Sequence, residues 1–294
     1  MAKFTGVFVA TVTPFTDSYE VDYEKLRDHA DWLISEGVNG LIPCGSVGEY
    51  ATLSSEERAK VVETVLEVAK DRVPVLVGSG APSTQESVKW VQHAKDHGAA
   101  GIMALPPINY NPQENEVIAH YEALSEVGLP IVLYNNPLEY KTDLTPDFLV
   151  KLQSIENVVG VKEFSTDLRR VHTILDKTNL EVLIGVDDLG LEGPAVGATG
   201  WIAGFANVFP KESVEIFNLG REGKVQEALE LYRSLLPIFY YDGLPTLVQA
   251  IKYSLELKGR PVGPTRPPRL PLAKDKLEKI KEAFEYASNR KQTV

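Results

Sequence analysis

The chain has 294 residues, of which 44% are hydrophobic and 24% charged, and its formal net charge is -11 at pH 7. This balance is typical of a folded globular protein that can bury a substantial core in one large or two small domains. The negative charge argues against a nucleic-acid or anionic-membrane partner, because both bind to basic surfaces.

The single cysteine, Cys44, excludes an internal disulfide framework. No apolar run reaches the length of about 18 residues that spans a membrane, and the first residues do not resemble a signal peptide. We therefore expect a cytoplasmic protein.

Short apolar, β-branched runs alternate with longer amphipathic segments over the first two thirds of the chain. That order is typical of repeated β-α units on a parallel sheet. The predicted strands are residues 6–12, 40–44, 73–78, 101–105, 130–135, 158–164, 181–186 and 199–204. Eight such units predict a single (β/α)8 TIM barrel, a fold whose usual size is about 250 residues. A doubly wound sheet is the alternative.

Helix start signals lie between the predicted strands. Two of them have the spacing of a capping box, in which a serine and a glutamate three residues later bind each other's backbone N–H groups. The signals are Asp22, Ser54 with Glu57, Ser83 with Glu86, and Thr145 before Pro146.

A helical region follows the eight β-α units. Amphipathic patterns predict helices near residues 211–222, 224–239, 244–258 and 273–289, and prolines exclude a helix over 259–272. We expect a barrel over residues 1–208 and a C-terminal helical extension over 209–294 that packs on it. The extension is a candidate contact surface in an oligomer.

Lys162 lies near the end of the predicted strand over residues 158–164, in an otherwise largely apolar run. Side chains alternate along a strand, so Lys162 shares one face with Gly160. If that face points into the barrel, burial lowers the pKa of the lysine and leaves a neutral amine that can attack a carbonyl carbon. Lys162 is therefore a candidate Schiff-base nucleophile. A lysine that reaches solvent or pairs with a carboxylate is the alternative.

Two further candidates lie at strand ends, where TIM barrels have their active sites. Tyr134 can pass protons to and from a carbonyl or hydroxyl oxygen, although a core tyrosine bonded to the backbone is the alternative. The glycine-containing turn over residues 44–50 carries Ser46, whose hydroxyl can hold a substrate carboxylate together with backbone N–H groups. A tight turn without a ligand is the alternative for this segment.

The histidines and acidic residues do not form a metal site at the strand ends. All five histidines fall inside predicted helices, including His93 and His97, which have a ligand-like spacing. Asp187 and Asp188 fit helix caps better than ligands. A phosphate-binding loop is also missing. We expect no metal ion, no cofactor and no phosphorylated substrate.

Four motifs in this order resemble the dihydrodipicolinate synthase and N-acetylneuraminate lyase family of class I, Schiff-base aldolases, over nearly the whole chain. They are G-S-V-G-E (45–49), Y-N-N-P (134–137), G-V-K-E (160–163) and G-V-D-D (185–188). The resemblance implies that Lys162 forms an imine with a 2-oxo acid, that Tyr134 shuttles protons, and that Ser46 with the amides of residues 46–48 holds the carboxylate. It also implies that Gly185 and Ile202 line the pocket, and that the protein is a homo-oligomer, either a tetramer or a dimer.

Several positions depart from the synthases of this family. Val47 replaces the second hydroxyl of the G-[ST]-T-G-E turn, so the usual hydroxyl relay to the tyrosine is missing. Leu138 and Glu139 stand where the synthases have Gly-Arg, whose arginine binds the carboxylate of the second substrate. The tyrosine-rich loop after the fourth strand is Pro-Ile-Asn-Tyr here, with Asn109 and Tyr110.

The Y-N-N-P form and the segments at 200–210, 247–252 and 266–272 look more similar to a branch that includes 1-pyrroline-4-hydroxy-2-carboxylate deaminases and related dehydratases. We therefore favour a deaminase- or dehydratase-type lyase that acts on a small 2-oxo acid or cyclic imino acid. The alternatives are a 4-hydroxy-tetrahydrodipicolinate synthase, an N-acetylneuraminate lyase-like aldolase, a metal-dependent aldolase or isomerase, and a non-catalytic barrel that binds small acids. The candidate substrate-binding residues are Val47, Gly48, Glu49, Asn109, Tyr110, Asn136, Glu139, Gly185 and Ile202.

Overall fold

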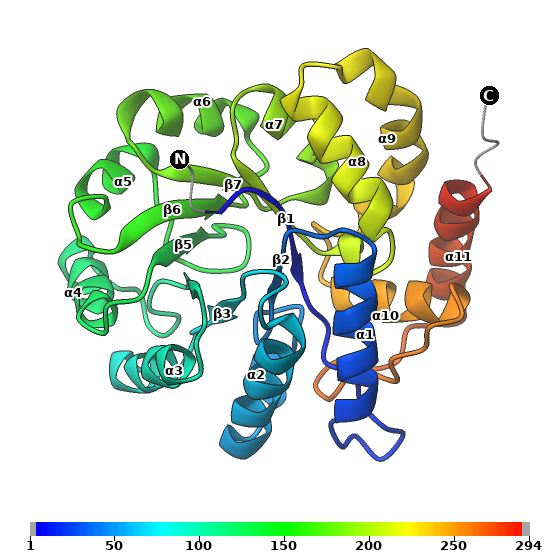
Figure 1. Ribbon diagram of the computed structural model, residues 1–294, viewed down its shortest axis with the longest axis horizontal. Coiled ribbons are helices and arrows are strands. Elements are labelled where there is room, and N and C mark those ends of the chain that lie inside the picture. Colours follow the sequence, from blue (N-terminus) through cyan, green and yellow to red (C-terminus); the bar gives the residue numbers. More distant parts are fainter. Residues whose placement is uncertain (1–3, 290–294) are drawn as a thin grey trace.

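The computed structural model describes residues 4–289. Its strands are β1 (Gly6–Ala10), β2 (Gly40–Ile42), β3 (Leu76–Gly78), β4 (Gly101–Ala104), β5 (Ile131–Asn135), β6 (Val158–Glu163), β7 (Glu181–Ile184) and β8 (Gly200–Ala203). They form one 8-stranded sheet in the order β2-β1-β8-β7-β6-β5-β4-β3, and a parallel bridge between Leu41 and Val75 brings its two edges together. Neighbours in sequence are thus neighbours in the sheet, which confirms the TIM barrel and excludes the doubly wound alternative (Figure 1).

The helices that alternate with the strands surround this barrel (Figure 1). They are α1 (Tyr23–Ser35), α2 (Ser55–Ala69), α3 (Thr84–Asp96), α4 (Glu114–Ser125), α5 (Pro146–Leu152), α6 (Leu168–Lys177), α7 (Glu192–Ala195) and α8 (Pro210–Arg221). Short 3-10 turns lie in three of the loops, namely η1 (Tyr50–Thr52), η2 (Asp187–Leu189) and η3 (Phe205–Asn207).

The predicted helix starts are confirmed. Each predicted cap residue accepts a hydrogen bond from a backbone N–H group in the first turn of α1, α2, α3 or α5. The capping box at Ser54 and Glu57 is complete. At Ser83 and Glu86 only the bond from the Glu86 N–H group to the serine hydroxyl forms.

The predicted ends of β3 and β5 are correct, whereas the other six strands end one or two residues earlier than the apolar runs predict. The predicted strand over 40–44 stops at Ile42. Cys44 has a φ of 60°, in the left-handed region that a strand residue cannot adopt. The chain therefore leaves the sheet after Ile42, two residues before the apolar run ends.

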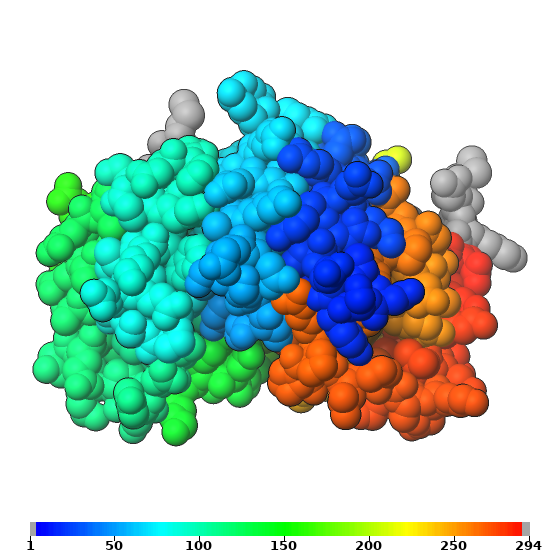
Figure 2. Space-filling model, turned by 90° about the horizontal axis from the view of Figure 1, so that it is seen from below, coloured from blue at the N-terminus to red at the C-terminus, as the bar shows by residue number. Residues whose placement is uncertain are grey.

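Three helices form the C-terminal region after α8, close to where the sequence predicts them. They are α9 (Val225–Phe239), α10 (Leu247–Leu257) and α11 (Lys274–Ser288). The helix α9 packs against α8 and α11, and α10 packs against α11 and η3. Figure 2 shows the orange C-terminal segments against the blue N-terminal ones, where the Phe15 N–H group donates to the Val262 carbonyl. The division at residue 208 stays a prediction, and residues 290–294 of the expected extension lie outside the described residues.

The barrel and its outer helices share one large apolar core. Among its fully buried side chains are Trp201 on β8 and Phe8 on β1. Within residues 4–289, no helix has both the length and the apolar character that crossing a membrane requires. The core thus supports the strand ends on which the candidate site lies.

Candidate active site

A cavity of about 280 Å³ lies at the carboxyl ends of the barrel strands. Residues at or just after the ends of β1, β5, β6 and β8 line it, together with residues from the C-terminal region. Six of the expected site residues lie on its wall: Ser46, Val47, Tyr134, Asn136, Glu139 and Lys162. The structure therefore brings together residues from three different β-α units.

Lys162 is buried on β6, with only 5% of its surface exposed. Burial lowers the pKa of its amine to about 8, and the carboxyl groups around it oppose that shift. Gly185, at the end of β7, leaves room for this side chain, since a Cβ atom there would lie 2.9 Å from Lys162 Cε. At pH 7 roughly a tenth of the amine is thus uncharged and able to act as a nucleophile, far more than for an ordinary lysine.

Tyr134 is the partner of Lys162 in the register between β5 and β6. The Lys162 Nζ atom lies 4.2 Å from the centroid of the tyrosine ring. Burial raises the pKa of Tyr134 well above its ordinary value, so the phenol keeps its proton. Its hydroxyl accepts a hydrogen bond of 3.2 Å from Asn136 Nδ2. The phenol is therefore held beside the lysine as a proton donor.

The turn after β2 has unused hydrogen-bond donors. Within the described part of the chain, the backbone N–H groups of Ser46, Val47 and Gly48 donate to no protein acceptor. The turn is tight, because a Cβ atom at Gly48 would lie 3.0 Å from the carbonyl oxygen of Thr11. The Ser46 hydroxyl lies 3.1 Å from the hydroxyl of Tyr140. Successive free N–H groups beside a hydroxyl make a suitable site for a carboxylate.

The other expected residues do not line the cavity. The Asn109 amide donates to the Pro82 carbonyl at 2.8 Å, and Tyr110 is 91% exposed on the loop after β4. Ile202 is fully buried within β8. Gly48 and Gly185 instead shape the backbone beside the cavity, as the close contacts above indicate.

Glu49 lies behind the turn rather than in the cavity. Its side chain is 0% exposed and forms an ion pair of 2.8 Å with Lys252 on α10, which is 4% exposed. Its second oxygen accepts a hydrogen bond of 3.0 Å from the N–H group of Arg266. Glu49 therefore ties the carboxylate-binding turn to the C-terminal region.

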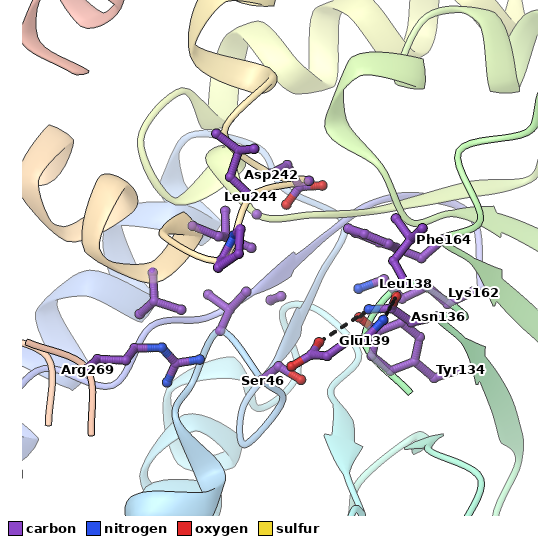
Figure 3. Close-up of a pocket in the computed structure, with 17 residues that line it drawn as sticks. Ser46, Tyr134, Asn136, Leu138, Glu139, Lys162, Phe164, Asp242, Leu244 and Arg269 are labelled. Carbon is purple, nitrogen blue, oxygen red and sulfur yellow. Dashed lines mark hydrogen bonds between the residues drawn. The ribbon is translucent and has the colours of Figure 1, made fainter. Parts of the chain in front are cut away.

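The C-terminal region supplies two charged groups to the cavity that the sequence analysis does not identify. Asp242 lies in the turn between α9 and α10, and Arg269 lies in the proline-rich segment 259–272. Figure 3 shows Arg269 on the side opposite Lys162 and Tyr134, with Asp242 on a third side. Neither residue stands at a strand end, so the alternation of strands and helices gives no signal for them. Tyr140, the partner of Ser46, also follows a strand by too many residues to be found in this way.

The described residues contain one cluster that could hold a metal ion, and it lies elsewhere. Glu63 on α2 and His93 and His97 at the end of α3 bring their ligand atoms within 4.8 Å of one another. None of the three lines the cavity.

The sequence predicts that Asp187 caps a helix that follows it. Its carboxylate instead accepts hydrogen bonds from the backbone N–H groups of Gly204 and Phe205, at the start of η3.

Comparisons with known proteins find relatives that match nearly the whole chain. The model of the dihydrodipicolinate synthetase family matches residues 3–287. The 4-hydroxy-tetrahydrodipicolinate synthase of Natronomonas pharaonis is 38% identical over 285 residues, covering 96% of this chain and 97% of the relative. That of Methanothrix thermoacetophila is 37% identical over 290 residues, covering 97% and 98%. Among solved structures, the dihydrodipicolinate synthase of Aquifex aeolicus superposes with a TM-score of 0.92 at 30% identity, covering 97% of this chain and 98% of that one.

The chain therefore belongs to the dihydrodipicolinate synthetase family. It is an enzyme of the class I aldolase type, a lyase that works through a lysine Schiff base. Family membership does not fix the substrate, which depends on the residues around the lysine.

Proposed function

We propose that Lys162 forms a Schiff base with a small 2-oxo acid or cyclic imino acid, and that the enzyme then breaks a bond next to the imine. The observation that carries this proposal is the contact between the buried amine of Lys162 and the ring of Tyr134 at the wall of the cavity. A desolvated lysine beside a protonated phenol has the two groups that imine chemistry needs.

Each group around the cavity has a role in the proposed reaction. The turn at Ser46 binds the substrate carboxylate and directs the adjacent carbonyl carbon toward Lys162. The neutral amine attacks that carbon, and Tyr134 transfers protons to and from the oxygen. The protonated imine is an electron sink, so a C3 proton, a C3–C4 bond or a C4 substituent can then be lost through the same enamine.

We favour loss of a C4 substituent, as in a deaminase or dehydratase, because of Glu139. This residue lines the cavity and accepts a hydrogen bond of 3.3 Å from Asn136 Nδ2. Burial raises the pKa of its carboxyl group. A carboxyl group with a raised pKa is better suited to donate a proton to a departing hydroxyl or amine.

A second candidate is 4-hydroxy-tetrahydrodipicolinate synthase, which the curated relatives named above are. A synthase must bind the carboxylate of a second substrate, and the resemblance leaves Glu139 at the position of the arginine that does so. Arg269 supports this candidate. It lines the cavity, and its guanidinium donates no hydrogen bond within residues 4–289, where its ion pair with Glu49 is 3.7 Å long. Since Lys252 already neutralises Glu49, the charge of Arg269 is available to an anionic substrate group.

A substrate panel separates the two candidates. Pyruvate with aspartate semialdehyde tests the synthase, sialic acid tests the aldolase alternative, and 3-deoxy-2-oxo sugar acids and the hydroxyproline-derived imino acid test a dehydratase or deaminase. Turnover of the hydroxylated or imino acids without condensation supports the favoured proposal. Condensation of pyruvate with the semialdehyde at higher kcat/KM would replace it with the synthase.

We further propose a homo-oligomer in a cytoplasmic setting, with no cofactor. The family resemblance supports the oligomer, and the single, buried cysteine Cys44 is consistent with a reducing compartment. Light scattering coupled to size-exclusion chromatography tests the oligomer, and a monomer at micromolar concentration would contradict it.

A further inference from the structure

We infer that Asp242 is a second proton-transfer residue of this site: its carboxyl group protonates the hydroxyl of the carbinolamine on Lys162, and its carboxylate then faces the resulting iminium ion. This inference rests on the proposed Schiff-base function. It gives the C-terminal region a direct part in the chemistry, although that region lies outside the barrel strands.

The backbone around Asp242 is shaped to admit its carboxyl group. Asp242 is 4% exposed and lies on the cavity wall together with Lys162. Gly204, just after β8, faces it directly, since a Cβ atom there would lie only 2.7 Å from Asp242 Oδ1. Any larger residue at position 204 would displace the carboxyl group. The loops after β8 and after α9 therefore fit together around this one side chain.

The neighbouring carboxyl groups of Asp187 and Asp242 receive different numbers of hydrogen bonds. Asp187 receives three donors, from the Trp201 indole and the N–H groups of Gly204 and Phe205, at 3.0, 3.0 and 2.6 Å. Asp242 receives one, from the N–H group of Asp187 to its Oδ2 atom at 3.0 Å. Within the described part of the chain its Oδ1 atom has no donor. Asp187 is thus a satisfied structural acceptor, whereas Asp242 retains an oxygen free to exchange a proton.

Charges around Asp242 favour a carboxyl group that holds its proton until the substrate reacts. Burial, together with the charges of Asp187 and Asp188, raises its pKa well above the ordinary value, whereas the charge of Lys162 and the hydrogen bond from the Asp187 N–H group oppose this. Conversely, an ionised Asp242 is the strongest of the groups that raise the pKa of Lys162, ahead of Asp187 and Glu139. The amine and the carboxyl group titrate as a linked pair, without a direct ion pair between them. A substrate oxygen can therefore come between them.

The proton transfer balances without any further reactant. The neutral amine of Lys162 adds to the substrate carbonyl, and Tyr134 moves a proton from the nitrogen to the oxygen, which gives a neutral carbinolamine. The Asp242 carboxyl group then donates its proton to the carbinolamine hydroxyl, the C–O bond breaks, and water leaves. The nitrogen lone pair forms the C=N bond, which yields an iminium cation and an Asp242 carboxylate. The two new charges stabilise each other in a buried setting. Return of the proton to Asp242 accompanies hydrolysis of the product imine.

The test compares the variants Asp242→Asn and Asp17→Asn with the wild type in the rate of cyanoborohydride trapping with pyruvate. Asparagine keeps the shape and the acceptor for the Asp187 N–H group but cannot supply the proton. We expect the trapping rate of Asp242→Asn to fall by roughly 10²-fold, the usual range for general acid catalysis. The decline of the trapping rate on the alkaline side of the pH profile should also disappear in this variant, because asparagine has no proton to lose there. Asp17→Asn, at an exposed position on the loop after β1 that does not line the cavity, should behave like the wild type.

A wild-type measurement covers the case in which Asp242→Asn fails to fold. The trapping rate of the wild type should rise with pH as Lys162 loses its proton, and it should fall again at higher pH as Asp242 loses its proton. An unchanged rate and profile in Asp242→Asn, or a wild-type rate that only rises with pH, would overturn the inference. Absence of any adduct in the wild type would instead overturn the proposed function, so the two failures are distinguishable.

Discussion

Tyr134 and Lys162 are register partners on β5 and β6, and the lysine amine lies 4.2 Å from the centroid of the tyrosine ring. An aromatic face attracts an ammonium ion, whereas burial disfavours it. The second effect is larger here, because the pKa of Lys162 is lowered to about 8. The pair therefore places an amine that loses its proton more easily than an ordinary lysine next to a phenol that keeps its proton.

Replacing Tyr134 by phenylalanine should slow turnover without preventing the imine from forming. The ring remains beside Lys162, but the proton donor is lost, and general acid–base groups contribute roughly 10²- to 10⁴-fold. We expect kcat to fall by about that factor while borohydride still traps pyruvate. Tyr286→Phe, on the exposed surface of α11, is the matched control. A wild-type kcat in Tyr134→Phe would remove the tyrosine from the mechanism.

The rate of imine formation should increase with pH on the acid side of the profile. Only the unprotonated amine attacks, and its fraction grows as the pH rises through the lysine pKa of about 8. Trapping with pyruvate under single-turnover conditions, at several pH values, measures this limb directly. A midpoint near the ordinary lysine value would mean that Lys162 is not desolvated in solution.

Loss of Lys252 should destabilise the protein through Glu49. Lys252→Met would leave the fully buried carboxylate of Glu49 with only its longer ion pair to Arg269, and breaking a buried ion pair costs about 3 to 5 kcal/mol. Urea unfolding measures this loss, and adding Glu49→Gln should restore much of it. If the double variant were no more stable than Lys252→Met, the unpaired charge would not be the cause.

Two arginines of the proline-rich segment should respond differently to substitution. Arg266 donates to Thr52, Tyr19 and Glu57, so Arg266→Met should lower the free energy of unfolding. Arg269 faces the cavity with unused donors, so Arg269→Met should raise KM for substrates with a second carboxylate. A charged hydrogen bond contributes about 1.5 to 3 kcal/mol, which corresponds to roughly tenfold or more in KM. Equal effects on substrates with and without that carboxylate would exclude this role.

The sequence predicts the parts of the molecule that follow a local rule. Alternation of short apolar runs and amphipathic segments predicts the barrel, and the helix caps at Asp22 and Ser54 follow from side chains near the backbone that they bind. The alternation of side chains along β6 predicts that Lys162 shares a face with Gly160. Tyr134 is a candidate because it lies near the carboxyl end of a strand, where TIM barrels have their active sites. These inferences depend only on residues that are close to one another in the sequence.

The rest depends on contacts between distant segments. The carboxylate of Glu49 pairs with Lys252, which no local pattern indicates, and so Glu49 is expected in the cavity although it lies behind it. Asp242 and Arg269 reach the cavity from loops of the C-terminal region, whose positions depend on how α9, α10 and α11 pack. Strand ends are likewise set by turn geometry, as the positive φ of Cys44 shows.

The most direct test of the Schiff-base mechanism is the mass of the protein after reduction with borohydride in the presence of saturating pyruvate. The account predicts one stable adduct per chain, located by peptide mass spectrometry on the segment that contains Lys162, and no adduct in Lys162→Met. No adduct in the wild type, or an adduct on a different lysine, would contradict it.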